Sequence, residues 1–466
     1  MISRTDRWMW ALRWATGLCA LLFVLAVSVV AGALHLLRPG PGEWAVPARI
    51  GPWRGELSGP ALLRIATNPM LLERIDGRIW DTPVGPVSVH AGAAAASWRA
   101  VCAPCSLQAD SLGRASVQLP RVEVTWQRDV RMDLVGEFVL SSSAASALDV
   151  EAARGAVAAT RPTSPPAALT TPLHGRWRLR NQVQQVELSL SLAGAPLASA
   201  LGLVADRVPE LAHAKVDGRL NLELQWSWPS RLLSVKPRLE GFRVAGLGTE
   251  ALLDALPSGP AAPRPANQGA WLARAVLAAE DPRFFEHTGF DAVDLGTAFS
   301  SAPRDGSPRR NPSTLSQQLA RLILSGDDAS PVRKLRELLH AVELDRTLGK
   351  ARTLGLYLAL APWGAGECGA AAATTRYLGQ EVHELDPLDA AWLASLLHNP
   401  DAELAQMART GQPNALRVRW IVEHLRPLNR AKRRALLDAL DDWTLPPQAF
   451  DAAALQGVRV AASPRP

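Results

Sequence analysis

The sequence predicts a multidomain α+β protein, and three observations support this fold class. At 466 residues the chain is longer than one ordinary hydrophobic core allows, so two or three domains are expected. Apolar and polar residues alternate between about residues 43 and 246, which predicts a β-rich antiparallel domain, whereas apolar residues recur at helical spacing from Trp271 onward. Residues 257–270 are rich in Pro, Ala and Gly and predict a linker between the two patterns.

The N-terminal segment predicts a single transmembrane helix over residues 15–37. This apolar stretch is long enough for a hydrocarbon core of about 30 Å, which takes roughly 20 helical residues. Several arginines lie within residues 1–14, so the positive-inside rule makes those residues a cytoplasmic tail and places the rest of the chain outside. A cleaved signal peptide is the alternative, because Ala31-Gly32-Ala33 resembles a cleavage site. Either way, the bulk of the protein is expected to be exported.

Composition and charge limit the function classes. Hydrophobic residues make up 48% of the chain and charged residues 20%, which is normal for a folded protein and excludes disorder throughout. The 50 Lys and Arg against 44 Asp and Glu give a formal net charge of +6, which suits attraction to anionic lipid headgroups or diphosphates. No nucleic-acid partner is expected.

Five segments of the β-rich region alternate most clearly and predict a half-buried antiparallel sheet. They are residues 115–128, 130–142, 175–192, 215–228 and 234–246. One helix is expected over residues 60–75, and residues 141–172, rich in Ala, Ser, Thr and Pro, predict a flexible insertion. The histidines of this region are isolated in the sequence, so we expect no catalytic group in it. We expect a membrane-proximal spacer or a docking surface for other envelope proteins.

Cys102 and Cys105 form a C-x-x-C pair in a segment with the pattern of strand and turn. A thioredoxin-like site would place such a pair at a helix start after a strand, and a zinc site would need a second pair. The sequence offers neither context. Outside the cytosol a local disulfide is the favoured interpretation, with redox catalysis and metal binding as alternatives.

The most informative stretch runs from Glu280 to Asp291, EDPRFFEHTGFD. Two adjacent acids close a predicted helix and are followed by aromatic residues, His287 and Gly289. Acids at a helix C-terminus oppose the macrodipole, so helix stability alone does not favour them. The pattern ED-x-x-F-x-x-H-x-G-x-D resembles the first motif of the glycosyltransferase family that polymerises peptidoglycan from lipid II, found in penicillin-binding proteins and monofunctional biosynthetic transglycosylases.

The resemblance continues in order along the chain. Residues 311–321, NPSTLSQQLAR, resemble the second motif of the family, and residues 331–346 carry its R-K-x-x-E pattern. Later parts of the pattern follow to about residue 436. The resemblance implies a mainly α-helical, lysozyme-like transglycosylase domain over residues 271–440, followed by a tail over residues 441–466.

The chain departs from the family pattern at four positions. Asn311 and Pro312 replace two glycines of the second motif, Gly355 replaces a glutamate and Ala359 replaces an asparagine. These departures leave open a lineage that has lost activity.

The resemblance implies roles for particular residues. Glu280 matches the catalytic glutamate, which would act as general base on a sugar hydroxyl. Glu337 would orient nearby cations or assist the departure of the leaving group. Fixed cations would stabilise the leaving diphosphate. The residues implied in substrate binding, including these cations, are Asp281, Phe284, His287, Ser313, Thr314, Gln317, Gln318, Arg321, Arg333 and Lys334.

The resemblance also implies partners and a location. Lipid II and the nascent glycan strand would be the substrates, and the protein would lie in the bacterial inner membrane with its catalytic domain on the periplasmic side. No cofactor is assigned; a divalent cation, Mg²⁺ or Mn²⁺, is left open. Transpeptidase motifs do not follow the transglycosylase region. Two other functions remain open: a catalytically inactive scaffold of the cell-wall machinery, and a lysozyme-like enzyme that cleaves glycan.

Overall fold

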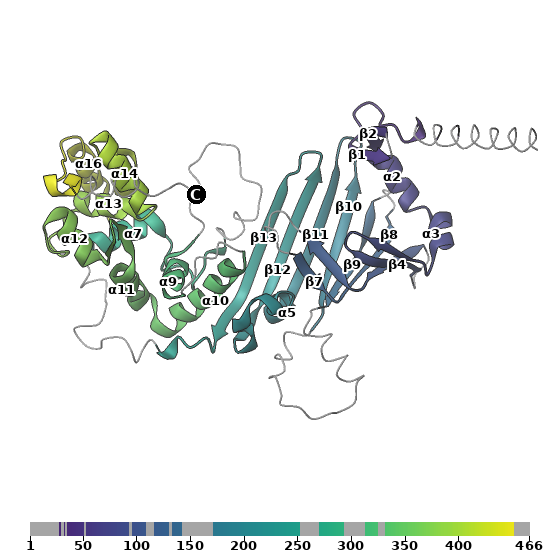
Figure 1. Cartoon of the computed structure of the whole chain (residues 1–466), viewed down its shortest axis with the longest axis horizontal. Coiled ribbons are helices and arrows are strands. Elements are labelled where there is room, and N and C mark those ends of the chain that lie inside the picture. The colour runs from purple at the N-terminus through teal and green to yellow at the C-terminus, as the bar shows by residue number, and fades with distance from the viewer. Residues whose placement is uncertain are drawn as a thin grey trace, which may run out of the picture.

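The computed structural model of the chain has a large antiparallel sheet with a helical region at one end (Figure 1). It describes residues 35–50, 53–92, 96–108, 116–129, 133–141, 171–251, 270–292, 313–324 and 331–451, with Ser28 and Gly32. Four expectations fall wholly or mainly outside these residues: the cytoplasmic tail 1–14, the transmembrane helix 15–37, the insertion 141–172 and the linker 257–270. Within the described ranges, no helix is both long enough and apolar enough to cross a bilayer.

Nine antiparallel strands form the main sheet in the order β13-β12-β11-β10-β9-β8-β5-β4-β3. Their bounds are β3 Ile79–Thr82, β4 Gly85–Ala91, β5 Ser97–Cys102, β8 Arg121–Arg128, β9 Leu134–Ser141, β10 Leu173–Asn181, β11 Val186–Pro196, β12 Lys215–Trp228 and β13 Leu233–Ala245. The alternation predicted the strand character of β8 to β13, but residues 175–192 form two strands, β10 and β11, joined by a turn, and β3, β4 and β5 lie outside the five predicted segments. A mixed α+β architecture with a large antiparallel sheet is confirmed.

The pleat gives the sheet one apolar and one polar face. Trp177 of β10 pairs with Leu190 of β11, and Leu190 pairs with Leu224 of β12, so these three side chains lie on the same face. Their neighbours Arg176 and Arg178 point to the opposite face and are exposed. Successive residues of a strand point to opposite faces, so a sequence that alternates apolar and polar residues gives one apolar and one polar face.

A short hairpin lies against the ends of two strands of the sheet, β10 and β12. The hairpin of β1 (Ala45–Ile50) and β2 (Trp53–Ser58) is tied to the sheet by two indoles. Trp44 Nε1 donates to Asn181 Oδ1 at 3.0 Å, and Trp228 Nε1 donates to the Ala45 carbonyl at 2.8 Å.

The helix expected over residues 60–75 is two helices, α2 (Gly59–Ala66) and α3 (Pro69–Ile75). Asn68 accepts a hydrogen bond from Met70 N and so caps the second helix. Pro69 occupies its first turn, where a missing N–H is harmless, but a proline would interrupt a continuous helix. The apolar spacing continues across this break, which is why the sequence pattern alone gave one helix.

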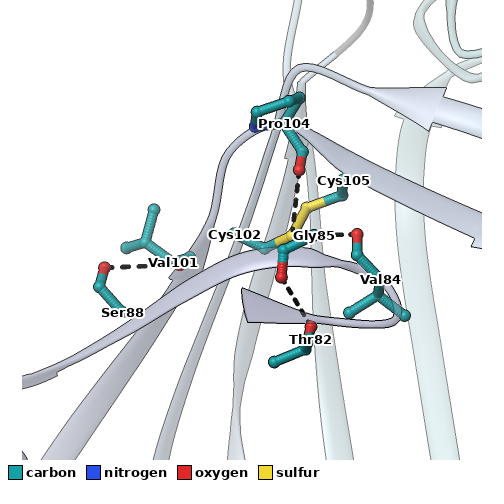
Figure 2. Close-up of a disulfide and its surroundings, with 8 residues drawn as sticks. All are labelled: Thr82, Val84, Gly85, Ser88, Val101, Cys102, Pro104 and Cys105. Atoms are coloured by element: carbon teal, nitrogen blue, oxygen red, sulfur yellow. Dashed lines mark hydrogen bonds between the residues drawn. A yellow bond between two sulfur atoms is a disulfide. The ribbon is translucent and has the colours of Figure 1, made fainter. Parts of the chain in front are cut away.

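Cys102 and Cys105 are joined by a disulfide with a Cα–Cα distance of 5.6 Å (Figure 2). The bond connects β5 to the start of β6 (Cys105–Gln108), which pairs with β7 (Ser116–Leu119) as a separate hairpin. Residues 115–128 are therefore not one strand. Pro120 lies between β7 and β8, and a proline cannot continue the hydrogen-bond ladder of a central strand.

The helical region begins after the sheet and has a continuous apolar core. Its helices are α7 Ala270–Glu280, α9 Leu315–Ile323, α10 Pro331–Leu348, α11 Lys350–Leu360, α12 Ala370–Leu378, α13 Pro387–Leu396, α14 Pro400–Thr410, α15 Ala415–His424 and α16 Arg430–Ala439, with a small hairpin of β14 Pro362–Gly364 and β15 Glu367–Cys368. Every residue from Leu388 to Leu396 is buried, so α13 is the central helix. Leu445 and Ala449, beyond α16, also join this core.

A smaller apolar cluster lies between the two regions. It joins α5 (Leu197–Gly202) and residues of β12 and β13 to Leu339 and Val342 of α10. Figure 1 shows α10 beside this edge of the sheet. The same helix therefore belongs to both regions.

Candidate functional site

Glu280, the last residue of α7, is held by two donors from distant helices. Its Oε1 accepts from Arg417 Nη2 of α15 at 3.0 Å, and its Oε2 accepts from Gln318 Nε2 of α9 at 3.1 Å. The Glu280 side chain is only 4% exposed. Both carboxylate oxygens are thus fixed in position, as an acid–base group requires.

Tyr357 of α11 completes this chain of hydrogen bonds. Its hydroxyl donates to Gln318 Oε1 at 2.8 Å, which leaves the amide nitrogen of Gln318 to face Glu280. Burial, and then the negative charge of Glu280, raises the pKa of the Tyr357 hydroxyl well above its usual value. The hydroxyl therefore keeps its proton and remains a donor.

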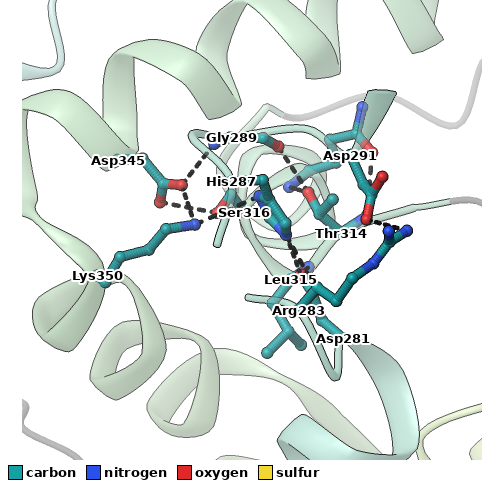
Figure 3. Close-up of polar contacts among 11 residues, drawn as sticks. Asp281, Arg283, His287, Gly289, Asp291, Thr314, Leu315, Ser316, Asp345 and Lys350 are labelled. Carbon is teal, nitrogen blue, oxygen red and sulfur yellow. Dashed lines mark hydrogen bonds and ion pairs between the residues drawn. The ribbon is translucent and has the colours of Figure 1, made fainter. Parts of the chain in front are cut away.

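Asp281 connects the turn after α7 to the start of α9 (Figure 3). Its Oδ2 accepts from Leu315 N at 3.0 Å, and its Oδ1 lies 3.0 Å from His287 Nε2. A carboxylate at a helix N-terminus meets unsatisfied N–H groups and the positive end of the dipole. The acid opposes the dipole of α7 but favours that of α9, so its placement has a structural reason.

Asp345 of α10 holds the other side of the turn (Figure 3). It accepts from Gly289 N at 2.6 Å and from Ser316 Oγ at 2.8 Å, and it pairs with Lys350 Nζ at 2.6 Å. The same Lys350 nitrogen lies 3.5 Å from His287 Nδ1. Asp281 and Lys350 therefore lie at the two ring nitrogens of His287, and Asp345 holds Lys350 in place.

Helix α9 begins with a capping box that uses two residues of the second motif. Thr314 Oγ1 accepts from Gln317 N at 3.2 Å, and Gln317 Oε1 accepts from Thr314 N at 3.0 Å. Thr314 also donates to the Gly289 carbonyl at 2.6 Å. Thr314 and Gln317 are thus buried supports of the site.

The basic pair of α10 lies next to the same helix start. Lys334 Nζ donates to Ser313 Oγ at 2.6 Å and pairs with Glu337 Oε2 at 3.0 Å, while Arg333 Nε pairs with Glu337 Oε1 at 3.2 Å. Glu337 is 1% exposed, whereas the Lys334 side chain is 46% exposed. One buried acid therefore positions two cations, and the Lys334 side chain is partly exposed to solvent.

The remaining predicted site residues differ in how buried they are. Phe284 is buried in the core with Lys350 Nζ 4.0 Å from its ring centre, so it supports the site rather than facing a ligand. Arg321 is exposed in the last turn of α9, one turn after Gln318. Asn311 and Pro312 lie outside the described residues, and Gly355 is buried in α11 two residues before Tyr357.

Sequence reasoning missed several residues of this network, including Lys350 and Ser316 beside Asp345. Arg417 is the direct cation of Glu280, and Asp345 and Tyr357 orient other members. Arg417 lies 137 positions from Glu280 in the sequence, so local spacing does not connect the two residues. Among the described residues, no group of three or more His, Cys, Asp or Glu could hold a metal ion.

This construction defines a class of protein. A buried acid, fixed by amide and guanidinium donors at the end of one helix, lies in the same helical bundle as a basic pair positioned by a second buried acid. A buried carboxylate and a basic pair are therefore joined through α9. These are the kinds of group that general acid–base catalysis and the stabilisation of a developing negative charge use.

Comparisons with known proteins identify the family of this region. Residues 264–425 match the family described as Transglycosylase. The biosynthetic peptidoglycan transglycosylase of Nitrosomonas eutropha is 39% identical over 129 residues, which cover 28% of this chain and 53% of that protein. The protein of the same name from Shewanella amazonensis is 40% identical over 166 residues, which cover 35% of this chain and 65% of that protein.

The family resemblance drawn from the motifs is thus confirmed for residues 264–425, which match the Transglycosylase family. The match spans about half the length of the curated relatives, with 53% and 56% of the Nitrosomonas and Azoarcus proteins covered. The nine-stranded sheet lies outside residues 264–425.

Proposed function

We propose that this chain is a peptidoglycan glycosyltransferase that polymerises lipid II. The observation that carries the proposal is the pairing of Glu280 with Arg417 and Gln318 inside a region that matches the Transglycosylase family. The names of the relatives support the substrate class.

We propose that one step joins the acceptor to the growing glycan. Glu280 takes the proton of the acceptor 4-hydroxyl, and the oxygen forms a bond to the anomeric carbon of the growing glycan. The bond from that carbon to the diphosphate breaks, and undecaprenyl diphosphate leaves with the electron pair. Attack from the face opposite the leaving group inverts the anomeric carbon.

The residues of this chain contribute to the two ends of that step differently. Arg417 and Gln318 hold the carboxylate of Glu280, so little reorganisation is needed when the proton moves. Lys334, Arg333 and the exposed Arg321 supply positive charge for the departing diphosphate, with Glu337 orienting the first two. A general base in this role contributes about 10² to 10⁴ in rate.

The proposal includes a location and a division of labour. The apolar residues 15–37 support a single-pass anchor in the inner membrane with the helical region on the periplasmic side. Donor and acceptor both carry polyprenyl tails, so a membrane-bound enzyme would meet them at the surface. We propose a lysozyme-like fold for residues 271–440 and a spacer or docking role for residues 43–246.

The experiment is lipid II polymerisation by the purified full-length chain, followed by gel analysis of the glycan product. Glu280→Gln keeps the shape of the side chain but removes the base, so polymer should fall at least 10²-fold while circular dichroism stays unchanged. Glu423→Gln is the matched control, because Glu423 lies exposed on α15, the helix that carries Arg417. It should polymerise like the wild type.

Other outcomes identify the alternatives. A wild type that binds lipid II without turnover would overturn the enzyme proposal in favour of an inactive scaffold. Release of soluble fragments from finished peptidoglycan would indicate a glycan-cleaving enzyme instead. Equal activity of the Glu280→Gln variant and the wild type would remove Glu280 from the mechanism.

A further inference from the structure

Helix α10 has two buried faces on nearly opposite sides. Glu337, Ala341, Leu344 and Leu348 face the helical region, where the last three join its core. Leu335, Leu339 and Val342, with Val332, face the cluster that includes Val244 of β13 and Leu211. At 3.6 residues per turn these two sets lie about half a turn apart. A helix at the surface of one domain buries a single face, so the second buried face of α10 reflects its packing against the sheet.

Glu343 fixes α10 to the chain that leaves the last strand. Its Oε1 accepts from Leu247 N at 2.8 Å, and its Oε2 accepts from Thr249 N at 3.3 Å and from the Thr249 hydroxyl. Glu343 is 1% exposed. Three hydrogen bonds to one buried carboxylate make a strong and geometrically specific contact.

A second polar contact lies near the start of α10. Arg336 pairs with Glu210, which belongs to the 3-10 turn η4 (Pro209–Ala212) next to the sheet. Arg336 follows Arg333 and Lys334 by only three and two positions. The contact therefore lies within one turn of the basic pair on α10.

The first-motif turn is packed into this junction as well. Gly289 has φ +76, and a Cβ added there would lie 2.5 Å from Val342 N of α10. Its neighbour Phe290 meets Phe242 of β13 edge-to-face, with ring centres 5.4 Å apart. The sheet thus touches the turn that carries His287 and the helix that carries Lys334.

We propose that the edge of the sheet positions the anion-binding part of the site, and that Glu343 is the positioning residue. By holding α10 to Leu247 and Thr249, Glu343 sets where Arg333 and Lys334 lie relative to Ser313 and α9. The inference rests on the proposed function for the identity of the anion, a diphosphate. Leu247, Thr249, Glu210 and Phe242 all lie outside the matched residues 264–425, so this support comes from outside the family region of the chain.

The test measures binding of inorganic pyrophosphate to the full-length chain by calorimetry, at a temperature where every variant is folded. Glu343→Ala should weaken binding about 10-fold, since a displaced neighbouring contact changes coupling by roughly 0.5 to 2 kcal/mol. Glu343→Gln, which keeps an acceptor oxygen, should lie between the Ala variant and the wild type. Thr249→Val removes one donor with little change in volume and should weaken binding about 2-fold in the same direction.

The control separates positioning from general destabilisation. Leu119→Ala removes a buried side chain from the cluster around the disulfide, which is separate from the cluster that contains α10. It should lower the melting temperature but leave the pyrophosphate dissociation constant within about 2-fold of the wild type. Unchanged pyrophosphate binding in Glu343→Ala and Thr249→Val would overturn the proposal.

The proposal and the proposed function can fail separately. A wild type that binds pyrophosphate but makes no polymer would overturn the enzymatic function, while the Glu343 comparison would still decide the positioning role. If the wild type polymerises lipid II but neither variant binds pyrophosphate more weakly, the enzymatic function stands and the positioning role of the sheet is overturned.

Discussion

The sheet and the helical region place their ion pairs in different surroundings. In the sheet, Arg176 and Glu137 face each other at 3.7 Å with side chains 83% and 70% exposed. In the helical region, Asp345 pairs with Lys350 at 2.6 Å and its side chain is 1% exposed. Glu280 and Glu337 are similarly buried.

The difference separates exposed ion pairs, which contribute little to stability, from buried charges, which call for a functional explanation. Exposed pairs contribute about 0 to 1 kcal/mol, because water and salt screen them. Buried charges lose several kcal/mol of hydration, which good geometry only partly restores, so stability alone is a poor reason to keep them. Their concentration around α9 and α10 favours this part of the molecule as the functional site.

The largest effect should follow removal of Arg417. Arg417→Ala leaves the carboxylate of Glu280 buried without its cation, and breaking such a pair from one side costs about 3 to 5 kcal/mol. Displacement of the acid should also reduce polymerisation about 10²-fold or more. Urea unfolding and the polymerisation assay would measure the two effects. An active and equally stable variant would show that the Arg417–Glu280 ion pair contributes as little as the exposed ion pairs of the sheet.

Gly289→Ala should come next. The residue has φ +76, where an L side chain costs about 1 to 2 kcal/mol, and the new Cβ would meet the backbone of α10 at 2.5 Å. We expect a loss of about 3 kcal/mol or more in unfolding free energy. Gly411→Ala is the control, because its φ is +67 but nothing lies within 4 Å of the added atom. Equal losses in the two variants would mean that only backbone strain matters.

A smaller effect is expected from His340 on α10, between the two regions. Burial lowers the pKa of His340, and the charge of Arg336 also lowers it, while Glu210 and Glu343 oppose this. The unfolded chain then binds the proton more readily, so the neutral side chain contributes stability that is full above about pH 6.5 and is lost as pH falls through the folded-state pKa.

His340→Gln should therefore flatten the fall in stability between about pH 7.5 and 5, as urea unfolding at several pH values would measure. His383→Gln, at an exposed position, serves as the control. An unchanged slope in the His340 variant would mean that the junction does not exclude the charged imidazole.

The smallest effect is expected at the surface of the sheet. Arg176→Ala removes an exposed pair and should change the unfolding free energy by less than about 0.5 kcal/mol. Polymerisation should stay at the wild-type level. A large loss in either measurement would break the contrast between the two regions and would point to a partner on the polar face.

Local pattern was sufficient for most of the fold. The alternation in residues 175–192 and 215–228 predicted β10, β11 and β12, because a strand buried on one face leaves a period of two in the sequence. It failed where a proline interrupted the pattern, as at Pro69 and Pro120. There the apolar spacing continued while the backbone could not.

The site was only partly predictable. Glu280, Asp281 and His287 stand within eight positions of one another, so one motif revealed them. The sequence by itself determined the strand and helix patterns, the family resemblance and the charged residues of its motifs, since each of these depends on residues close together in the chain. Only the tertiary structure decided that Arg417 holds Glu280 across 137 positions and that Glu343 joins α10 to the sheet across 94. Such contacts depend on how separate faces pack, and the local spacing of residues does not encode that.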